Sequence, residues 1–226
     1  MKSQRLIFPD AKALARELVE RTEVLAHASI FARGRFTCAL TGGSAAKELY
    51  PALAHAKLDW SRVHFYYGDE RCVPIDSVES NHAQAYAAMG RTGATFHHVD
   101  TRQAPAAAAR AYEANLPPLD LVHLGMGPDG HVCSLFPGHP LLEDEVDRVA
   151  FLTDSPKPPP ARVTLTFRGL REARHLWFLV LGEGKREAVK AALTDPQSML
   201  PAARAHRLAA ISLWFLDQPA ASLLAA

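Results

Sequence analysis

An acid and a histidine stand two positions apart in the glycine-rich stretch GMGPDGHVCSLFPG, residues 125–138. Asp129 and His131 could form a carboxylate–imidazole pair, in which the imidazole moves a proton and the carboxylate orients the ring. The stretch follows LDLVHL, an apolar run typical of a buried strand. Taken by itself, the short pattern is equally compatible with a solvated glycine turn that performs no chemistry.

The same stretch matches G-x-G-x-x-G, the pattern of a turn that binds a dinucleotide pyrophosphate. Asp154 follows the apolar run VAFLT at about the distance of a ribose-binding acid, which favours that interpretation. A dinucleotide turn, however, needs a long helix directly after its third glycine, and Pro137 and Pro140 interrupt this one. Asp129 would also place a negative charge against the pyrophosphate. The sequence therefore favours a catalytic loop, and we expect no cofactor.

Three other turns carry groups that suit an anion. In TGGS, Gly42 and Gly43 expose backbone N–H groups and Ser44 opens a predicted helix, an arrangement suited to a phosphate monoester. The turn lacks the lysine of a P-loop, so ATP is not implied. GDER supplies Arg71, whose guanidinium matches phosphate oxygens, and LGEGK supplies Lys185 in the first turn of a predicted helix.

Each of these turns also has a structural alternative. TGGS could be a simple strand-to-helix turn with Ser44 as the helix cap. Arg71 could form a surface ion pair with Asp69 or Glu70, and Lys185 could be solvated. The case for a phosphosugar site depends on whether these turns meet the Asp129–His131 pair.

The pattern of apolar runs predicts that they do meet. Strands alternate with helices, which favours a three-layer α/β/α fold with a mostly parallel, Rossmann-like sheet. All four turns leave strands in the same sense, and in such sheets ligands bind at the carboxyl ends of the strands. We predict strands at 35–41, 62–68, 95–99, 119–125, 149–153, 162–167 and 174–182, and helices at 11–33, 44–53, 81–90 (capped by Asn81), 104–116 and 182–193. The apolar run 207–217 could be a strand or a helix.

Composition limits the function classes. The chain has 226 residues, 48% of them hydrophobic, and a formal net charge of +1 without a basic stripe. We therefore expect one domain over 1–226 that binds neither nucleic acid nor membrane, as a monomer or small homo-oligomer. Cys38, Cys72 and Cys133 are too widely spaced for a disulfide framework, and no signal peptide or membrane span is evident, so we expect a cytoplasmic protein.

The remaining aromatic and histidine residues have structural interpretations. Trp177 and Trp214 lie in apolar runs and are expected in the core. His64, His123 and His175 stand at strand positions, where we expect buried or edge residues with satisfied hydrogen-bond partners. Their scattered spacing predicts no zinc site.

Taken together, the motifs resemble those of the glucosamine-6-phosphate isomerase/6-phosphogluconolactonase family over nearly the whole chain. LDLVHLGMGPDGHVCSLFPGHPLL is similar to the family's signature loop, and TGGS, DERCVP with Ser80-Asn81, RVTLTF and LGEGK follow in the family's order. The deaminase branch has tyrosine where this chain has Arg71, which favours the lactonase branch. Two positions depart from the family: Ala45-Ala46 replace threonine and proline, and Val132-Cys133 replace threonine and alanine.

The resemblance implies hydrolysis of 6-phospho-D-glucono-1,5-lactone to 6-phosphogluconate in the pentose phosphate pathway. His131 would be the general base, with Asp129 orienting it. The phosphate would be bound by Gly42, Gly43, Ser44, Arg71, Lys185 and Arg162, and other substrate contacts would come from Asp69, Asn81 and Gly127. Two alternatives remain: an aminosugar-6-phosphate deaminase/isomerase in which Asp69 abstracts a proton, and a non-catalytic phosphosugar-binding domain, against which the lack of a DNA-binding segment argues.

Overall fold

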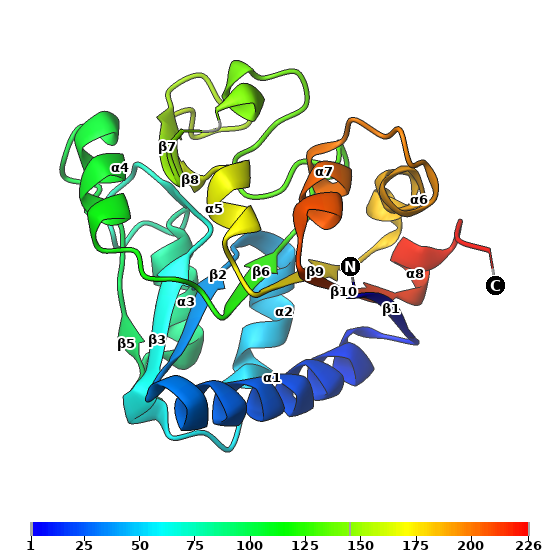
Figure 1. Cartoon of the computed structure of the whole chain (residues 1–226), viewed down its shortest axis with the longest axis horizontal. Coiled ribbons are helices and arrows are strands. Elements are labelled where there is room, and N and C mark those ends of the chain that lie inside the picture. Colours follow the sequence, from blue (N-terminus) through cyan, green and yellow to red (C-terminus); the bar gives the residue numbers. More distant parts are fainter. Residues whose placement is uncertain (1, 145, 226) are drawn as a thin grey trace.

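A parallel sheet forms the middle of the molecule (Figure 1). The computed structural model describes residues 2–144 and 146–225, and across them the sheet has seven strands in the order β1-β10-β9-β6-β2-β3-β5, with every neighbouring pair parallel. The strands are Lys2–Phe8 (β1), Phe36–Leu40 (β2), Val63–Tyr67 (β3), Thr95–Phe96 (β5), Leu121–Leu124 (β6), His175–Val180 (β9) and Ile211–Asp217 (β10).

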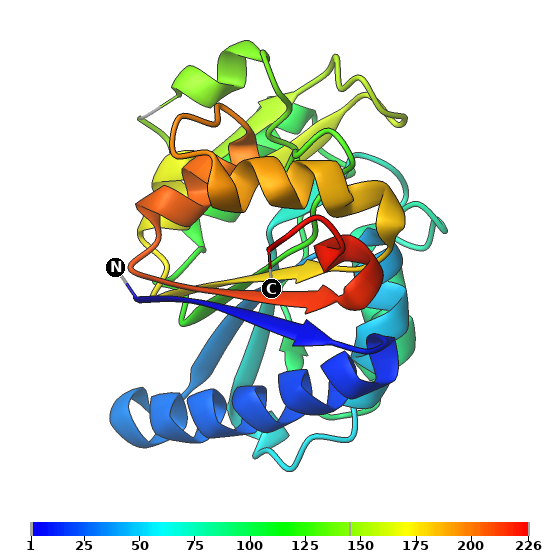
Figure 2. The same ribbon diagram turned by 90° about the vertical axis from the view of Figure 1, so that its right-hand side faces the viewer.

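Helices cover both faces of this sheet, which confirms the predicted three-layer α/β/α fold (Figures 1 and 2). One face packs on α1 (Ala11–Arg33), α2 (Gly43–Leu53) and α3 (Asn81–Met89). The other packs on α4 (Pro105–Ala114), α5 (Phe167–Arg171), α6 (Arg186–Thr194), α7 (Pro201–Leu208) and α8 (Gln218–Ala221). Short 3₁₀ helices span Trp60–Arg62, Pro140–Glu143 and Glu183–Lys185.

The strand β2 shows why its sequence is mostly apolar. Phe36, Cys38 and Leu40 pack into the core on the α1–α3 side, whereas Ala39 between them packs into the core on the opposite side. Successive side chains of a strand point to opposite faces, so a strand covered on both faces is apolar except where a buried polar group is hydrogen-bonded, as Thr37 is to Asp120.

A small antiparallel sheet lies beside the main one (Figure 1). Its three strands in the described chain follow the order β4-β8-β7 and span Asp69–Arg71 (β4), Arg162–Leu165 (β8) and Val149–Leu152 (β7). The register places Arg71 opposite Arg162. Two segments far apart in the sequence, GDER and the end of the proline-rich loop, are therefore neighbours.

Several predicted boundaries needed correction. Ser80, not Asn81, is the N-cap of α3, because its Oγ accepts a hydrogen bond from the Ala83 N–H at 3.1 Å, while Asn81 is the first helical residue. The apolar run near the C-terminus is strand β10, preceded by the unpredicted helix α7. Edge strand β1 was also not predicted, because KSQRLIF mixes polar and apolar residues.

The buried histidines differ from expectation. His123 is fully buried between the rings of Tyr50 and Trp177, and neither of its nitrogens has a partner among the described residues. His175 Nδ1 also lacks one, so the expected satisfied partners were wrong at both positions. His64 does have a partner, His97, at 3.0 Å. The organisation as one domain over 1–226 stays a prediction, and residues 1, 145 and 226 lie outside the described residues.

Candidate active site

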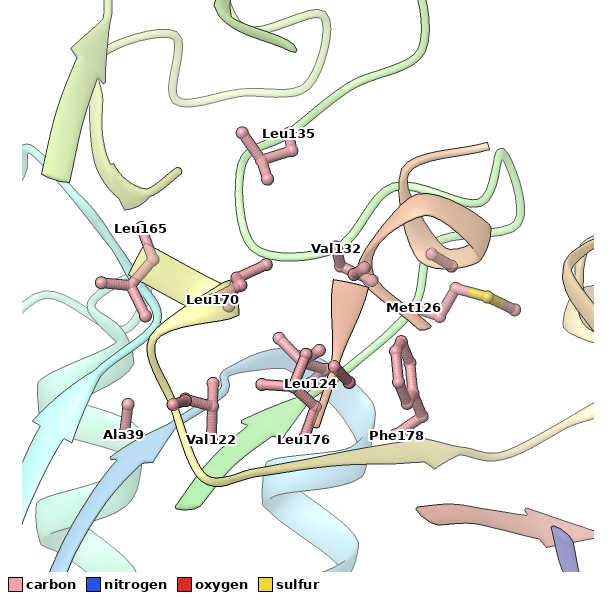
Figure 3. Close-up of a cluster of buried hydrophobic side chains, with 14 of the residues drawn as sticks. Ala39, Val122, Leu124, Met126, Val132, Leu135, Leu165, Leu170, Leu176 and Phe178 are labelled. Atoms are coloured by element: carbon pink, nitrogen blue, oxygen red, sulfur yellow. The ribbon is translucent and has the colours of Figure 1, made fainter. Parts of the chain in front are cut away.

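The glycine-rich loop after β6 is fixed by its own apolar side chains. Val132 and Leu135 are fully buried and Met126 nearly so, and all three belong to the core beside Leu124 and Phe178 (Figure 3). Within the loop, the Gly127 N–H donates to the His131 carbonyl at 2.9 Å. Because hydrophobic anchors stand on both sides of it, residue 131 is held on a rigid turn.

His131 and Asp129 form the predicted pair. His131 Nδ1 lies 2.5 Å from Asp129 Oδ1. A carboxylate only accepts hydrogen bonds, so Nδ1 carries the proton of the neutral ring and Nε2 is its basic nitrogen. Nε2 has no partner within the described residues. A histidine held in this tautomer is prepared to take a proton at Nε2.

Lys157 joins this pair and was missed in the sequence. Its Nζ lies 3.1 Å from Asp129 Oδ2 and 3.2 Å from His131 Nδ1. Lys157 belongs to the loop SPKPPPA, which connects β7 and β8. The pairing of these two strands in the antiparallel sheet places the loop next to the glycine-rich loop. The sequence showed only a lysine among prolines, and no periodic pattern marks it as functional.

The three groups influence one another's ionisation. Burial alone raises the pKa of Asp129, but hydrogen bonds and charges from His131 and Lys157 outweigh it and hold that pKa at about 2. Burial lowers the pKa of His131; Asp129 opposes this shift and the Lys157 charge adds to it. At neutral pH, Asp129 is therefore ionised and His131 is neutral, which is the state a general base needs.

A cavity of about 240 Å³ opens at the carboxyl ends of β2, β6 and β9. Its walls contain the predicted residues Gly42, Gly43, Ser44, Asp69, Arg71, Asn81, Gly127, His131, Arg162 and Lys185, together with Lys157. Asp129 is not part of the wall and contacts His131 from outside the cavity. The structure thus brings the imidazole and the predicted anion-binding turns to one place.

The TGGS turn meets the cavity through its backbone. Helix α2 begins at Gly43 with Gly42 as N-cap and no side-chain cap, so Ser44 is not the cap that the structural alternative required. A Cβ on Gly42 would lie 1.9 Å from Asn81 Oδ1, so only glycine fits there. The Thr41 side chain accepts from the Gly125 N–H at 3.1 Å and links the two glycine turns.

The three cationic side chains that the sequence predicted for the phosphate differ in how tightly the protein holds them. Arg71 donates through Nη1 to the Glu79 carbonyl at 2.6 Å, while its buried Nε has no partner in the described chain. The Lys185 ammonium group has no hydrogen bond or ion pair within the described ranges, and burial, with the Lys157 charge, lowers its pKa. Arg162 is 4% exposed and bonds the carbonyls of Lys157, Pro158 and Pro159, so it also fixes the proline-rich loop.

The acids of GDER are buried rather than paired at the surface. Glu70 is 2% exposed and accepts hydrogen bonds from the N–H groups of Asn81 and His82, both at 2.7 Å, at the start of α3. Asp69 accepts from Ser134 Oγ at 2.7 Å and from Asn81 Nδ2 at 3.1 Å. Residues 69–71 are therefore tied to α3 and to the glycine-rich loop, a role that sequence reasoning did not assign to Glu70.

Comparison with known proteins supplies the family. A model described as glucosamine-6-phosphate isomerases/6-phosphogluconolactonase matches residues 9–214. The chain belongs to this family. Within the family, it is 37% identical to the 6-phosphogluconolactonase of Mycobacterium tuberculosis, covering 99% of each chain. It is 36% identical to the probable chloroplastic 6-phosphogluconolactonase 3 of Oryza sativa subsp. indica, covering 97% of this chain and 75% of that one.

Solved structures of the family share the fold. The 6-phosphogluconolactonase of Trypanosoma cruzi superposes with a TM-score of 0.88 at 27% identity, covering 100% of this chain and 98% of that one. The Thermotoga maritima 6-phosphogluconolactonase gives a TM-score of 0.83 at 30% identity, covering 96% of this chain and 100% of that one.

Each of the two departures from the family pattern has one residue in the core, Val132 or Ala46, and one that lines the cavity, Cys133 or Ala45. Val132 is fully buried in the core below the glycine-rich loop, so an apolar residue suits the site. Ala45 and Ala46 are 5% and 2% exposed and pack in the core on the α1–α3 side. The groups that the TGGS turn offers to an anion are therefore its backbone N–H groups and Ser44. No group of three or more His, Cys, Asp or Glu within the described ranges is placed to hold a metal ion.

Proposed function

We propose that this protein hydrolyses 6-phospho-D-glucono-1,5-lactone to 6-phosphogluconate, in the oxidative branch of the pentose phosphate pathway. The observation that carries the proposal is that a neutral, correctly oriented His131 lines the same cavity as Arg71, Lys185 and the TGGS turn. Membership of the family, and the names of the relatives described above, support the same activity.

His131 acts as the general base. Its Nε2 takes a proton from a water molecule as the water oxygen attacks lactone carbon C1. The bond from C1 to the ring oxygen then breaks, and Nε2 returns the proton to that oxygen, which becomes a hydroxyl group. Asp129 stabilises the imidazolium that exists between the two steps. Backbone N–H groups of the glycine turns stabilise the negative charge that develops on the carbonyl oxygen.

The phosphate fixes the substrate relative to this base. The N–H groups of Gly42, Gly43 and Ser44, with Arg71, Lys185 and Arg162, bind its oxygens. Asp69, Asn81 and Gly127 contact the sugar. Binding energy from the remote phosphate then holds C1 near the water, so that part of the entropic barrier is removed before the chemical step.

The deaminase alternative assigns the base to Asp69 instead. That carboxylate is 6% exposed, and both of its oxygens accept hydrogen bonds from protein groups, whereas His131 Nε2 is free of partners among the described residues. The geometry therefore favours His131 as the group that moves a proton. Release of ammonia from glucosamine 6-phosphate would support the alternative, and tight binding of a phosphosugar without turnover would support a non-catalytic domain.

A coupled assay tests the proposal. Glucose-6-phosphate dehydrogenase generates the lactone in place, and 6-phosphogluconate dehydrogenase reports its hydrolysis as a second release of NADPH. The wild-type protein should speed this second phase beyond spontaneous hydrolysis, in proportion to its concentration. A second phase at the spontaneous rate would overturn the proposal.

The cellular setting stays a prediction. The described residues contain no helix long and apolar enough to cross a membrane. Cys38, Cys72 and Cys133 are all free. Free thiols fit the expected cytoplasmic location, and they fit any other reducing compartment equally well. A monomer or a small homo-oligomer is likewise still expected.

A further inference from the structure

The ammonium group of Lys157 contacts both members of the Asp129–His131 pair. We propose that Lys157 is a positioning residue for the reaction: it clamps the Asp129 carboxylate against the His131 ring and keeps that ring in its basic form. The inference rests on the proposed function, because it assigns to Lys157 a task that matters only if His131 is the base.

The clamp follows from the geometry of the carboxylate. Oδ1 of Asp129 faces His131 Nδ1 at 2.5 Å, and Oδ2 faces Lys157 Nζ at 3.1 Å, so each oxygen has its own donor. The Asp129 side chain is 36% exposed, and the His131 N–H reaches Oδ1 only at 3.5 Å, so little else fixes its rotation. Without Lys157, the carboxylate would be held through Oδ1 alone, and the orientation of the ring would be fixed less tightly.

The charge of Lys157 has a second effect. Nζ lies 3.2 Å from His131 Nδ1, but both atoms carry hydrogen in the resting state, so this contact is not a hydrogen bond. A positive charge so close opposes a second proton on the ring. The charge therefore keeps Nε2 of His131 unprotonated before the reaction. After the first step, it favours return of the proton from Nε2 to the leaving oxygen.

The charges around His131 act on its pKa in opposite directions. Asp129 and Asp69 favour protonation of His131, while Lys157 opposes it. Lys185, the next cation, interacts with Lys157 and Asp129. Burial also opposes this protonation, so removing Lys157 takes away one of two opposing effects, and we expect the pKa of His131 to rise.

The backbone of Lys157 is itself fixed, as a positioning role requires. Its carbonyl accepts hydrogen bonds from Ser155 Oγ at 2.8 Å and from Arg162 Nη2 at 3.0 Å, and its N–H contacts Ser155 Oγ at 3.2 Å. Three prolines follow it, and each has a restricted φ. The side chain is thus presented to the pair from a stiff support.

The test compares Lys157→Met with Lys157→Arg, and uses Lys190→Met on the exposed face of α6 as a matched control. Lys157→Met should lower kcat by about tenfold to a hundredfold, the worth of a hydrogen bond to a charged group, with little change in KM. The acid limb of its profile of kcat/KM against pH should move to higher pH. Lys157→Arg should keep the limb near its wild-type position, and Lys190→Met should match wild type.

Two results would overturn the inference. A raised KM with an unmoved acid limb would make Lys157 a substrate ligand, and unchanged kinetics would give it no part in the reaction. Titration of His131 by NMR of ¹⁵N-histidine-labelled protein adds a readout independent of activity. If the wild-type protein proved inactive on the lactone, an upward shift of the His131 titration in Lys157→Met would still establish the clamp, and only the proposed function would fail.

Discussion

Gly127 and His131 lie so close together that the space between them excludes even a methyl group. A Cβ built on Gly127 would lie 2.0 Å from His131 Nδ1 and 2.3 Å from Asp129 Oδ1. The absence of a side chain at Gly127 thus leaves room for the hydrogen bond between Asp129 and His131. This requirement explains the second glycine of the loop without a bound pyrophosphate.

Gly127→Ala should therefore disable the pair without unfolding the protein. Gly127 does not have a positive φ, so its backbone accepts alanine and the collision is with the pair itself. Displacing the ring by about 1 Å should lower kcat on the order of a hundredfold. Steady-state kinetics and thermal unfolding are the measurements. Gly184→Ala, where a Cβ meets no atom within 4 Å, serves as the control; equal activity of the two variants would contradict the geometry.

His131→Ala should lower kcat by about 10²–10⁴-fold while KM changes little, because the base is lost and the phosphate contacts remain. Asp129→Asn should lower kcat by roughly a hundredfold or more, because an amide can support the wrong tautomer of the ring. Single-turnover and steady-state assays would separate the two effects. A near-normal kcat in His131→Ala would remove this histidine from the chemistry.

The dependence on pH has a definite sign. His131 is active when neutral, so kcat/KM should fall as the pH drops through its pKa. Because burial lowers that pKa, the midpoint should lie below the ordinary histidine value of about 6.5. A profile of kcat/KM against pH gives the midpoint directly, because kcat/KM reports the ionisation of the free enzyme. A midpoint above the ordinary value would mean that the carboxylates outweigh burial and Lys157.

Arg71→Ala and Lys185→Ala should chiefly raise KM for the phosphorylated lactone. Each removes a charge-assisted contact to phosphate, so an increase of about tenfold to a hundredfold is expected, with a smaller change in kcat. Arg110→Ala, an exposed arginine on α4, is the control for a general loss of positive charge. Wild-type kinetics in both cavity variants would place the phosphate site elsewhere.

His123 should make the stability of the protein sensitive to acid. Burial lowers its pKa to about 3, below the unfolded value of about 6.5. Its contribution to stability is thus complete above the unfolded value and is lost as the pH falls toward 3, by up to about 1.4 kcal/mol per pH unit. His123→Leu, of similar volume, should lose less stability on acidification in denaturant unfolding. The exposed variant His27→Ala should behave like wild type; if His123→Leu did so too, the buried ring would not be the cause.

The order of layers could be predicted because the central strands are buried on both faces. Runs such as 119–125 and 174–182 are rich in apolar residues, so they stand out from their surroundings. Edge strand β1 has a neighbour on one side only, and its mixed pattern gives no comparable signal. Whether the last apolar run was a strand or a helix depended on its pairing with β9 and β1, which no local pattern contains.

The same distinction holds for the site. Asp129 and His131 are two residues apart, so their contact is local and visible in the sequence. Lys157 reaches them only because β7 and β8 return the intervening loop, and that contact is a property of the tertiary structure. Glu70 resembled a surface charge because two of its partners are backbone N–H groups that begin α3, and another is the hydroxyl of Ser80, ten residues away.

The pairing of β1 with β10 has a consequence for biosynthesis. Lys2 lies opposite Ile211 and Phe8 opposite Asp217, so the first described strand of the chain hydrogen-bonds to the last (Figure 2). During translation, β1 leaves the ribosome before β10 and has no partner until the long segment between the two strands has been synthesised. The sheet is completed only when β10 is available, and ribosome-bound chains that stop before β10 should leave β1 open to proteases and chaperones.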